Sequence, residues 1–264
     1  MPDKFVVYIL ALGFLLSGNI LAQNQEKSKL PLGKSIMHYF EANFQFRDKT
    51  QSIKPFSAPN KIAYLALGDS YTAGTSICYT CAFPVQLAYL LNENKSRDVQ
   101  ITRYAEAGWR TDDLINTLKL KNISSDFDFT TLLIGSNNLY QRKAFSQFKT
   151  EFLQLLEFAI NHTKNKAEGV FVISIPDYAY TPFGQKENNT KRISKKVNAY
   201  NSFIEEVAKQ RGVNFLDITA ITKRGLSEPT LIAKDGLHLS KKANTEIVNR
   251  IKPFIENVLK VKEP

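Results

Sequence analysis

The sequence is poor in the residues that hold metals and cross-link small domains. Its 264 residues include only two cysteines, three histidines and one tryptophan. Two cysteines exclude a disulfide-rich scaffold, and no second pair or nearby histidine completes a zinc site with Cys78 and Cys81. Ala82 excludes the haem-attachment pattern. We therefore expect neither a metal ion nor a cofactor.

Near its start the chain has no apolar run long enough to span a membrane. The stretch Phe5–Leu16 has 12 residues, whereas a spanning helix needs about 20. It follows Lys4 and is typical of a signal peptide cleaved after Ala22, with an uncleaved anchor as the alternative. Export predicts a periplasmic or secreted protein. In such an oxidising compartment we expect a disulfide between Cys78 and Cys81.

The charge is not concentrated in one segment. The 35 lysines and arginines exceed the 25 acidic residues and give a net charge of +10, but they are scattered along the chain. Scattered basic residues are typical of solvated helix faces, so we expect no nucleic-acid partner, with attraction to an anionic envelope polymer or membrane as the alternative. We expect a signal peptide at 1–22, an N-terminal extension at 23–60 and one folded domain at 61–264. That domain is expected to be a monomer with no membrane span after cleavage.

Apolar runs alternate with helical patterns from residue 61 onward. The unbroken apolar run Ile62–Leu67 ends at Gly68, which is typical of a strand buried on both faces. Four more strands are expected at 99–104, 129–134, 169–175 and 213–218. Helices are expected at 83–91, 111–120, 145–159, 193–207 and 243–258, with Thr111 as the N-cap of the second. This alternation predicts a three-layer α/β/α sandwich around a mainly parallel five-stranded sheet.

Three of the expected strands are followed by residues that could stabilise a negatively charged oxygen. Ser70 follows the first strand, Gly108 the second and Asn137 the third. Because the carboxyl ends of parallel strands share one edge, these residues are expected to lie together. The N–H groups of Ser70 and Gly108 and the side-chain amide of Asn137 are suitable donors for an oxyanion hole.

Asp235 and His238 are three residues apart in an expected loop. That spacing lets Asp235 accept a hydrogen bond from one ring nitrogen while the other takes the Ser70 proton. Each residue alone is also compatible with a simple turn or helix cap. Their joint occurrence favours a nucleophilic serine site. The Gly-x-Ser-x-Gly elbow of α/β-hydrolases is absent, because position 72 is threonine.

Taken in order, these motifs resemble those of the GDSL, or SGNH, hydrolase family. The serine motif matches Gly68-Asp69-Ser70, although Tyr71 replaces the usual leucine. The asparagine motif matches Gly135-Ser136-Asn137, although Asn138 replaces the usual acidic residue. The glycine and histidine motifs match Gly108, Asp235 and His238. The resemblance covers residues 62–259 and implies the flavodoxin-like fold of that family.

The resemblance also implies roles for single residues in a catalytic domain at 61–264. Ser70 is the expected nucleophile, His238 its base and Asp235 the carboxylate that orients His238. Ser70, Gly108 and Asn137 are the expected oxyanion hole. The expected activity is hydrolysis of a carboxylic ester through an acyl-enzyme. Acyl transfer to an envelope sugar or lipid, and a non-catalytic envelope-binding role, are the alternatives.

The sequence says less about the substrate. A family resemblance identifies neither the acyl group nor the alcohol, so a small-molecule, polysaccharide or lipid ester is expected. An aromatic pocket is expected to be lined by Tyr71, Trp109, Tyr140, Tyr178 and Phe183, with packing in the hydrophobic core as the alternative for such large aromatic residues.

Overall fold

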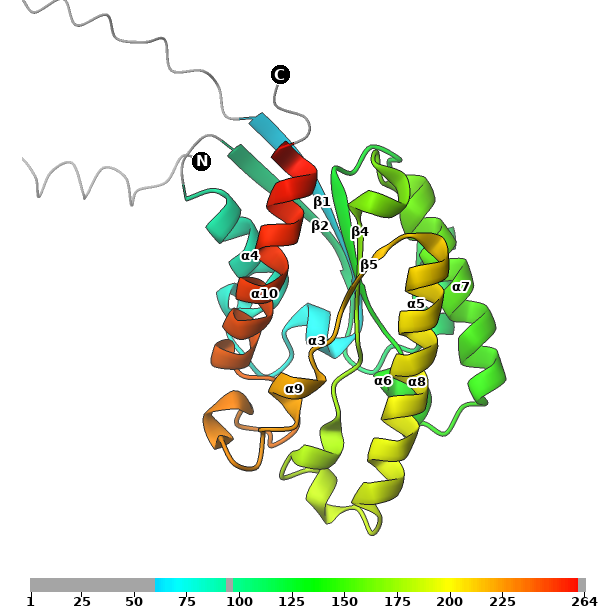
Figure 1. Cartoon of the computed structure of the whole chain (residues 1–264), viewed down its shortest axis with the longest axis vertical. Helices are drawn as coiled ribbons and strands as arrows, with labels where there is room; N and C mark the ends of the chain where they lie inside the picture. The colour runs from blue at the N-terminus through cyan, green and yellow to red at the C-terminus, as the bar shows by residue number, and fades with distance from the viewer. Residues whose placement is uncertain (1–59, 94–96, 261–264) are drawn as a thin grey trace, which may run out of the picture. The chain divides into compact units, whose positions relative to one another are not determined.

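The computed structural model describes residues 60–93 and 97–260, so the predicted signal peptide and nearly all of the predicted extension lie outside it. Within these ranges the chain forms one five-stranded sheet in the order β2-β1-β3-β4-β5, and every neighbouring pair is parallel (Figure 1). The strands are β1 (Asn60–Gly68), β2 (Arg97–Ala105), β3 (Phe129–Leu133), β4 (Val170–Ile173) and β5 (Asn214–Leu216). The predicted fold class is confirmed.

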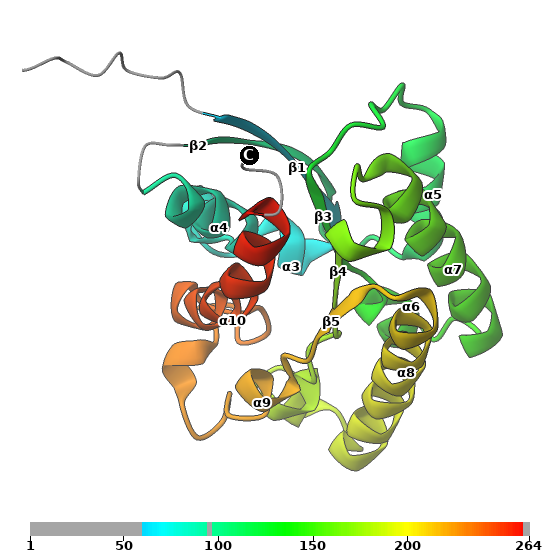
Figure 2. The same ribbon diagram turned by 45° about the horizontal axis from the view of Figure 1, so that its top comes forward.

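Helices cover both faces of the sheet (Figures 1 and 2). One face is covered by α4 (Phe83–Leu91), α9 (Thr219–Thr222) and α10 (Lys241–Lys260). The other is covered by α5 (Thr111–Lys119), α7 (Phe145–His162) and α8 (Thr190–Arg211). Two short helices, α3 (Ser70–Ala73) and α6 (Ser136–Tyr140), follow β1 and β3 directly. Short 3-10 helices are η1 (Tyr79–Cys81), η2 (Lys166–Gly169), η3 (Tyr178–Tyr180), η4 (Gly184–Lys186) and η5 (Pro229–Leu231).

Alternate residues of β1 belong to the two hydrophobic cores. Tyr64 and Ala66 pack into the core beneath α4 and α10, whereas Leu65 and Leu67 pack into the core beneath α5, α7 and α8. All four are fully buried. A strand with apolar residues on both faces needs cover on both sides, and this explains why β1 lies inside a three-layer fold.

The strand order reverses between β1 and β3. From β1 the chain goes to β2 at one edge, and from β3 it goes to β4 on the other side. In open α/β sheets, ligands bind in the crevice beyond the carboxyl ends of the strands at such a switch point. The fold thus points to the beginnings of α3 and α6 as the place for a site.

Two predicted boundaries are corrected by side-chain contacts. Arg110, not Thr111, is the N-cap of α5, because the Thr111 hydroxyl is engaged with Asn138 and Glu151. β4 ends at Ile173 rather than at 175, because the Asn201 side chain bonds both the N–H and the C=O of Ile175, at 2.8 and 3.0 Å. Among the described helices, none has the length and apolarity required to cross a bilayer.

Candidate active site

Ser70 stands at the tip of β1. A Cβ atom on Gly68 would lie 2.5 Å from the Leu133 carbonyl oxygen and 2.1 Å from the Thr72 hydroxyl, so only glycine lets the strand end here. Asp69 caps α3 by accepting the Tyr71 N–H at 3.0 Å. Ser70 is the first residue of that helix and is 5% exposed. Its side chain borders a cavity of about 280 Å³.

His238 and Asp235 form a tight pair in the loop before α10. His238 Nδ1 lies 2.5 Å from Asp235 Oδ2, and Asp235 Oδ1 accepts the N–H groups of Leu237 and His238 at 2.9 and 3.0 Å. With Nδ1 engaged, His238 Nε2 is the nitrogen left for a substrate or a serine. The predicted orientation of His238 by Asp235 has the geometry that a serine triad needs.

The Asp235 carboxylate is held in its ionised form. Partial burial alone would raise its pKa, but hydrogen bonds from the Ser76 and His238 side chains and from two backbone N–H groups lower the pKa of Asp235 well below its usual range. Ser76 has a φ of 66°, in the left-handed region. Sequence reasoning missed Ser76, because no motif marks it in the loop after α3.

The structure brings the predicted residues from three strand ends and the late loop around the same cavity. Ser70, Gly108, Asn137 and His238 all line it. The Ser70 hydroxyl forms no hydrogen bond within the described ranges, so Ser70 and His238 line the same cavity without being hydrogen-bonded to each other. Nucleophile–base contacts are often long in the absence of substrate.

Three donors at this cavity are free to bind an oxyanion. In the described part of the chain, the N–H groups of Ser70 and Gly108 have no acceptor. Gly108 has a φ of +86°, and a Cβ there would meet nothing within 4 Å, so glycine is needed for its backbone conformation rather than for space. Asn137 Nδ2 gives one hydrogen to the Trp109 carbonyl at 3.0 Å and keeps the other.

The aromatic wall of the cavity differs from the prediction at one residue. The cavity is lined by Tyr71, Tyr140, Tyr178 and Phe183. The ring of Tyr71 packs against that of His238 with the centroids 5.3 Å apart and the ring planes at 54°. Trp109 does not line the cavity. Its side chain packs instead against the core beneath α5, and only its carbonyl faces Asn137.

The family model of the GDSL-like lipase/acylhydrolase family matches residues 66–245. The chain belongs to this family. The match spans every motif described above, from the end of β1 to the first turns of α10.

Solved structures share the fold of this GDSL-family chain at low sequence identity. The acetylxylan esterase Axe2 from Geobacillus stearothermophilus has a TM-score of 0.59 at 15% identity, over 75% of this chain and 95% of that one. The α/β hydrolase LAE5 from the metagenome of Lake Arreo has a TM-score of 0.59 at 15% identity, over 76% and 97%. The esterase EstA from Pseudoalteromonas sp. has a TM-score of 0.52 at 14% identity, over 75% and 98%. No curated protein matches the sequence.

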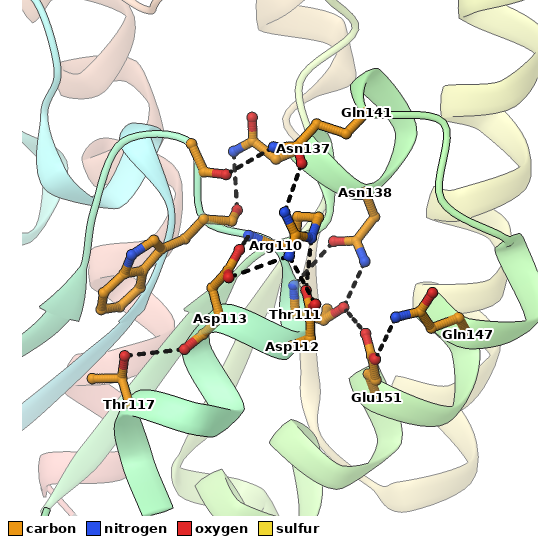
Figure 3. A network of polar contacts seen from close by, with 12 residues as sticks. Arg110, Thr111, Asp112, Asp113, Thr117, Asn137, Asn138, Gln141, Gln147 and Glu151 are labelled. Atoms are coloured by element: carbon orange, nitrogen blue, oxygen red, sulfur yellow. Dashed lines mark hydrogen bonds and ion pairs between the residues drawn. The ribbon is translucent and has the colours of Figure 1, made fainter. Parts of the chain in front are cut away.

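Asn138, where this chain departs from the GDSL-family motif, begins a buried hydrogen-bond chain (Figure 3). Asn138 is fully buried, accepts the Thr111 N–H at 3.0 Å and donates to the Thr111 hydroxyl at 2.6 Å. That hydroxyl donates to Glu151, which also accepts from Gln147. The chain of hydrogen bonds joins α6, α5 and α7.

The direction of this chain predicts the effect of restoring the usual acidic residue. Asn138→Asp should lower the free energy of unfolding by about 1–3 kcal/mol. The Thr111 hydroxyl donates its only hydrogen to Glu151, so the new carboxylate at position 138 would face a hydroxyl oxygen with no hydrogen left to donate. Glu151→Gln added to Asn138→Asp should recover most of that loss, since the new amide at position 151 would donate and the new carboxylate at position 138 would accept. Urea unfolding of the two single variants and the double variant measures the coupling. Simple additivity would contradict the assigned direction.

A second link ties the loop that contains Gly108 to the end of α6. Gln141 donates to the Gly108 carbonyl at 3.1 Å and accepts from Arg110 at 2.7 Å. Together with the bond from Asn137 to Trp109, it fixes the loop after β2 relative to the helix after β3 (Figure 3). Sequence reasoning missed Gln141 and Arg110, because their partners are distant in the chain.

The two cysteines close a small loop beside the site. Cys78 and Cys81 are joined by a disulfide with Cα atoms 5.0 Å apart, two residues after Ser76. For protein exported by its native host, we predict intact-mass measurement after alkylation to find no free thiol. Cys78→Ser with Cys81→Ser should cost about 2 kcal/mol of stability at most, because so short a loop removes little entropy from the unfolded chain. Two alkylated thiols in the exported protein would contradict the prediction.

Asp69 is a buried carboxyl directly before Ser70, the predicted nucleophile. Burial raises its pKa to about 7, despite the hydrogen bond from the Tyr71 N–H, and its Oδ2 has no hydrogen-bond partner among the described residues. The folded state therefore holds the Asp69 proton more tightly than the unfolded chain, whose pKa is about 3.9. The stability associated with this proton is complete below about pH 4 and is lost as the pH rises toward 7.

Asp69→Asn should remove this loss, because an amide keeps the capping oxygen and does not titrate. At about pH 8 the variant should be more stable than the wild type by up to about 4 kcal/mol, and at about pH 4 the difference should vanish. Urea unfolding across this range measures both curves. Asp126→Asn, at an exposed position, is the control. Curves for Asp69→Asn and wild type that stay parallel would refute the role of burial.

Proposed function

We propose that this protein is an exported serine esterase that cleaves a short-chain acyl ester through an acyl-enzyme. The observation that carries the proposal is the convergence of Ser70, His238 and three free donors on one cavity, with Asp235 behind His238. The ester hydrolase family to which the chain belongs supports the same reaction class.

In the proposed mechanism the Ser70 hydroxyl attacks the ester carbonyl while His238 Nε2 takes its proton. The negative charge on the carbonyl oxygen is stabilised by the N–H groups of Ser70 and Gly108 and by the Asn137 amide. His238 then gives the proton to the departing alcohol. Water attacks the acyl-enzyme in the same way, with His238 taking a proton from the water and returning it to Ser70. Asp235 stabilises the imidazolium form of His238 in both steps.

The size of the cavity supports a short acyl group. A volume of about 280 Å³, bordered by Tyr71, Tyr178 and Phe183, suits an acetyl group and a little of the adjoining alcohol better than a long chain. The structurally similar Axe2 is an acetylxylan esterase, which supports acetyl esters of sugars as the first substrates to test.

Steady-state hydrolysis of p-nitrophenyl acetate and p-nitrophenyl palmitate by the purified mature protein tests the proposal. We expect turnover of the acetate, with kcat/KM falling as the acyl chain lengthens. Faster cleavage of the palmitate would replace the short-chain assignment with a lipase-like one. No turnover of either ester would leave the non-catalytic role as the better account.

Export is the second part of the proposal. The signal-peptide pattern at 1–22 and the paired Cys78 and Cys81 support a periplasmic or secreted location. N-terminal sequencing of the protein recovered outside the cytoplasm should begin at Gln23.

A further inference from the structure

A second and larger cavity adjoins the active-site cavity. It has a volume of about 860 Å³ and lies between α6, the start of α7, the loop after η4 and α8; we call it the basic groove. Tyr140 and Tyr178 line both cavities, with ring centroids 6.2 Å apart in an edge-on arrangement. A substrate with its ester at Ser70 would therefore enter the basic groove by passing this tyrosine pair.

The groove carries an excess of positive charge that the fold does not use. Four cations line it and only one carboxylate, Glu187, does so. The cations are Arg142, Lys143, Arg192 and Lys196. None of the four forms an ion pair within residues 60–93 and 97–260, whereas Arg110, Arg211 and Arg224 elsewhere on the domain do. Unpaired cations around a concave surface attract an anion and add to its local concentration.

Arg142, one of the four cations, closes the end of α6 in a left-handed conformation. Arg142 follows α6 and has a φ of 57°, a left-handed conformation that glycine adopts without strain and arginine does not. Its N–H bonds to the Leu139 carbonyl at 3.1 Å and closes the helix end. The N–H of Lys143 bonds to the Asn138 carbonyl at 2.9 Å, so the left-handed residue belongs to the C-terminal cap of α6, where glycine could take its place.

We propose that the basic groove binds the alcohol part of the substrate, and that this part is an acidic oligosaccharide carrying carboxylates. This inference rests on the proposed esterase function. Arginine pairs with carboxylates through two parallel hydrogen bonds, and the tyrosines between the cations offer flat faces and hydroxyls to sugar rings. An anionic lipid fits less well, because its long acyl chain would need more room than the small cavity at Ser70 provides.

Paired charge-neutralising variants on α8 test the groove. Arg192→Gln with Lys196→Gln removes two charges inside it, and Lys191→Gln with Lys195→Gln removes two from neighbouring positions of the same helix that do not line it. The substrates are acetylated oligogalacturonate and acetylated xylo-oligosaccharide, which differ in charge. The groove variant should lower kcat/KM roughly three- to tenfold on the galacturonate alone, and the control variant should change it less than twofold. Neither variant should alter hydrolysis of p-nitrophenyl acetate.

Binding measured without turnover separates this inference from the proposed function. Calorimetric titration with unesterified oligogalacturonate should give an affinity that falls with added salt and falls again in the groove variant. That result holds for the groove even if no ester is cleaved. Equal affinity in the wild type and both variants would overturn the inference, and so would equal kcat/KM for the two oligosaccharides. Preferential hydrolysis of a lysophosphatidylglycerol, lost in the groove variant, would instead assign the groove to an anionic lipid.

Arg142→Gly provides an independent test. Because glycine relieves the backbone at this position, the variant should melt at the same or a higher temperature than the wild type. It should nevertheless bind oligogalacturonate several-fold more weakly, by the loss of one charged contact. A gain in stability with unchanged binding would show that Arg142 plays no part in the groove.

Discussion

Replacing Ser70 with alanine should reduce ester hydrolysis to background while leaving the fold intact. Ser70 lies directly after β1 and lines the same cavity as the free donors and His238, and in the proposed mechanism nucleophile and base act as one unit. His238→Ala should therefore cost about as much as Ser70→Ala, and the double variant little more. The expected loss in kcat is about five to six orders of magnitude in each case. Turnover of p-nitrophenyl acetate gives the rates, and thermal unfolding checks the fold.

Ser136 offers a matched control for this experiment. It lines the same cavity, is 8% exposed, and its hydroxyl has no hydrogen-bond partner among the described residues. Ser136→Ala should leave kcat within a few-fold of wild type, because this hydroxyl has no base beside it in the proposed mechanism. If Ser136→Ala were inactive and Ser70→Ala active, the nucleophile would be wrongly assigned.

Asn137→Ala should lower kcat by about 10²–10³-fold with little change in KM. The variant removes one donor from the developing oxyanion, and such a donor is worth about 2.7–4 kcal/mol when the rest of the hole is intact. The effect falls on kcat because the interaction strengthens only in the transition state. Asn137→Asp should be as damaging, since a carboxylate has no hydrogen to donate. Steady-state kinetics on one ester at one pH measures both.

The loss of the bond between Asn137 and Trp109 is a competing explanation that a control can separate. Gln141→Ala breaks the equivalent link to the Gly108 carbonyl and removes no donor from the cavity. It should cost only a few-fold in kcat. If Gln141→Ala and Asn137→Ala were equally damaging, the role of Asn137 would be to position the loop rather than to donate to the oxyanion.

The part of the site that lies at strand ends could be predicted from sequence. Apolar runs mark β1 and β3 and an alternating pattern marks β2. The residues that follow must lie at the carboxyl edge, and Ser70, Gly108 and Asn137 follow these three strands. The pair of Asp235 and His238 could be predicted because its contact is local, three residues apart. These inferences needed only the hydrophobic pattern of the strands, their order along the chain and the three-residue spacing between Asp235 and His238.

Contacts between distant segments could not be predicted in this way. Trp109 was expected in the pocket, but which way a side chain turns at a loop depends on what packs beside it. Thr111 has the composition of an N-cap, but a partner 40 residues away takes its hydroxyl. The basic groove gathers side chains from α6 and α8, and scattered basic residues in the sequence gave no sign that four would share a concave surface.

The placement of the proposed nucleophile and base in the sequence affects when esterase activity can arise during synthesis. Ser70 follows the first strand of the described domain, whereas His238 lies just before its final helix. Nearly the whole sequence of the domain therefore separates the proposed nucleophile from the proposed base. Residues so far apart in the chain meet only when the sheet and both helical layers are complete. A nascent, truncated or partly unfolded chain therefore holds a serine without its base, and the proposed esterase is harmless to its surroundings until folding ends.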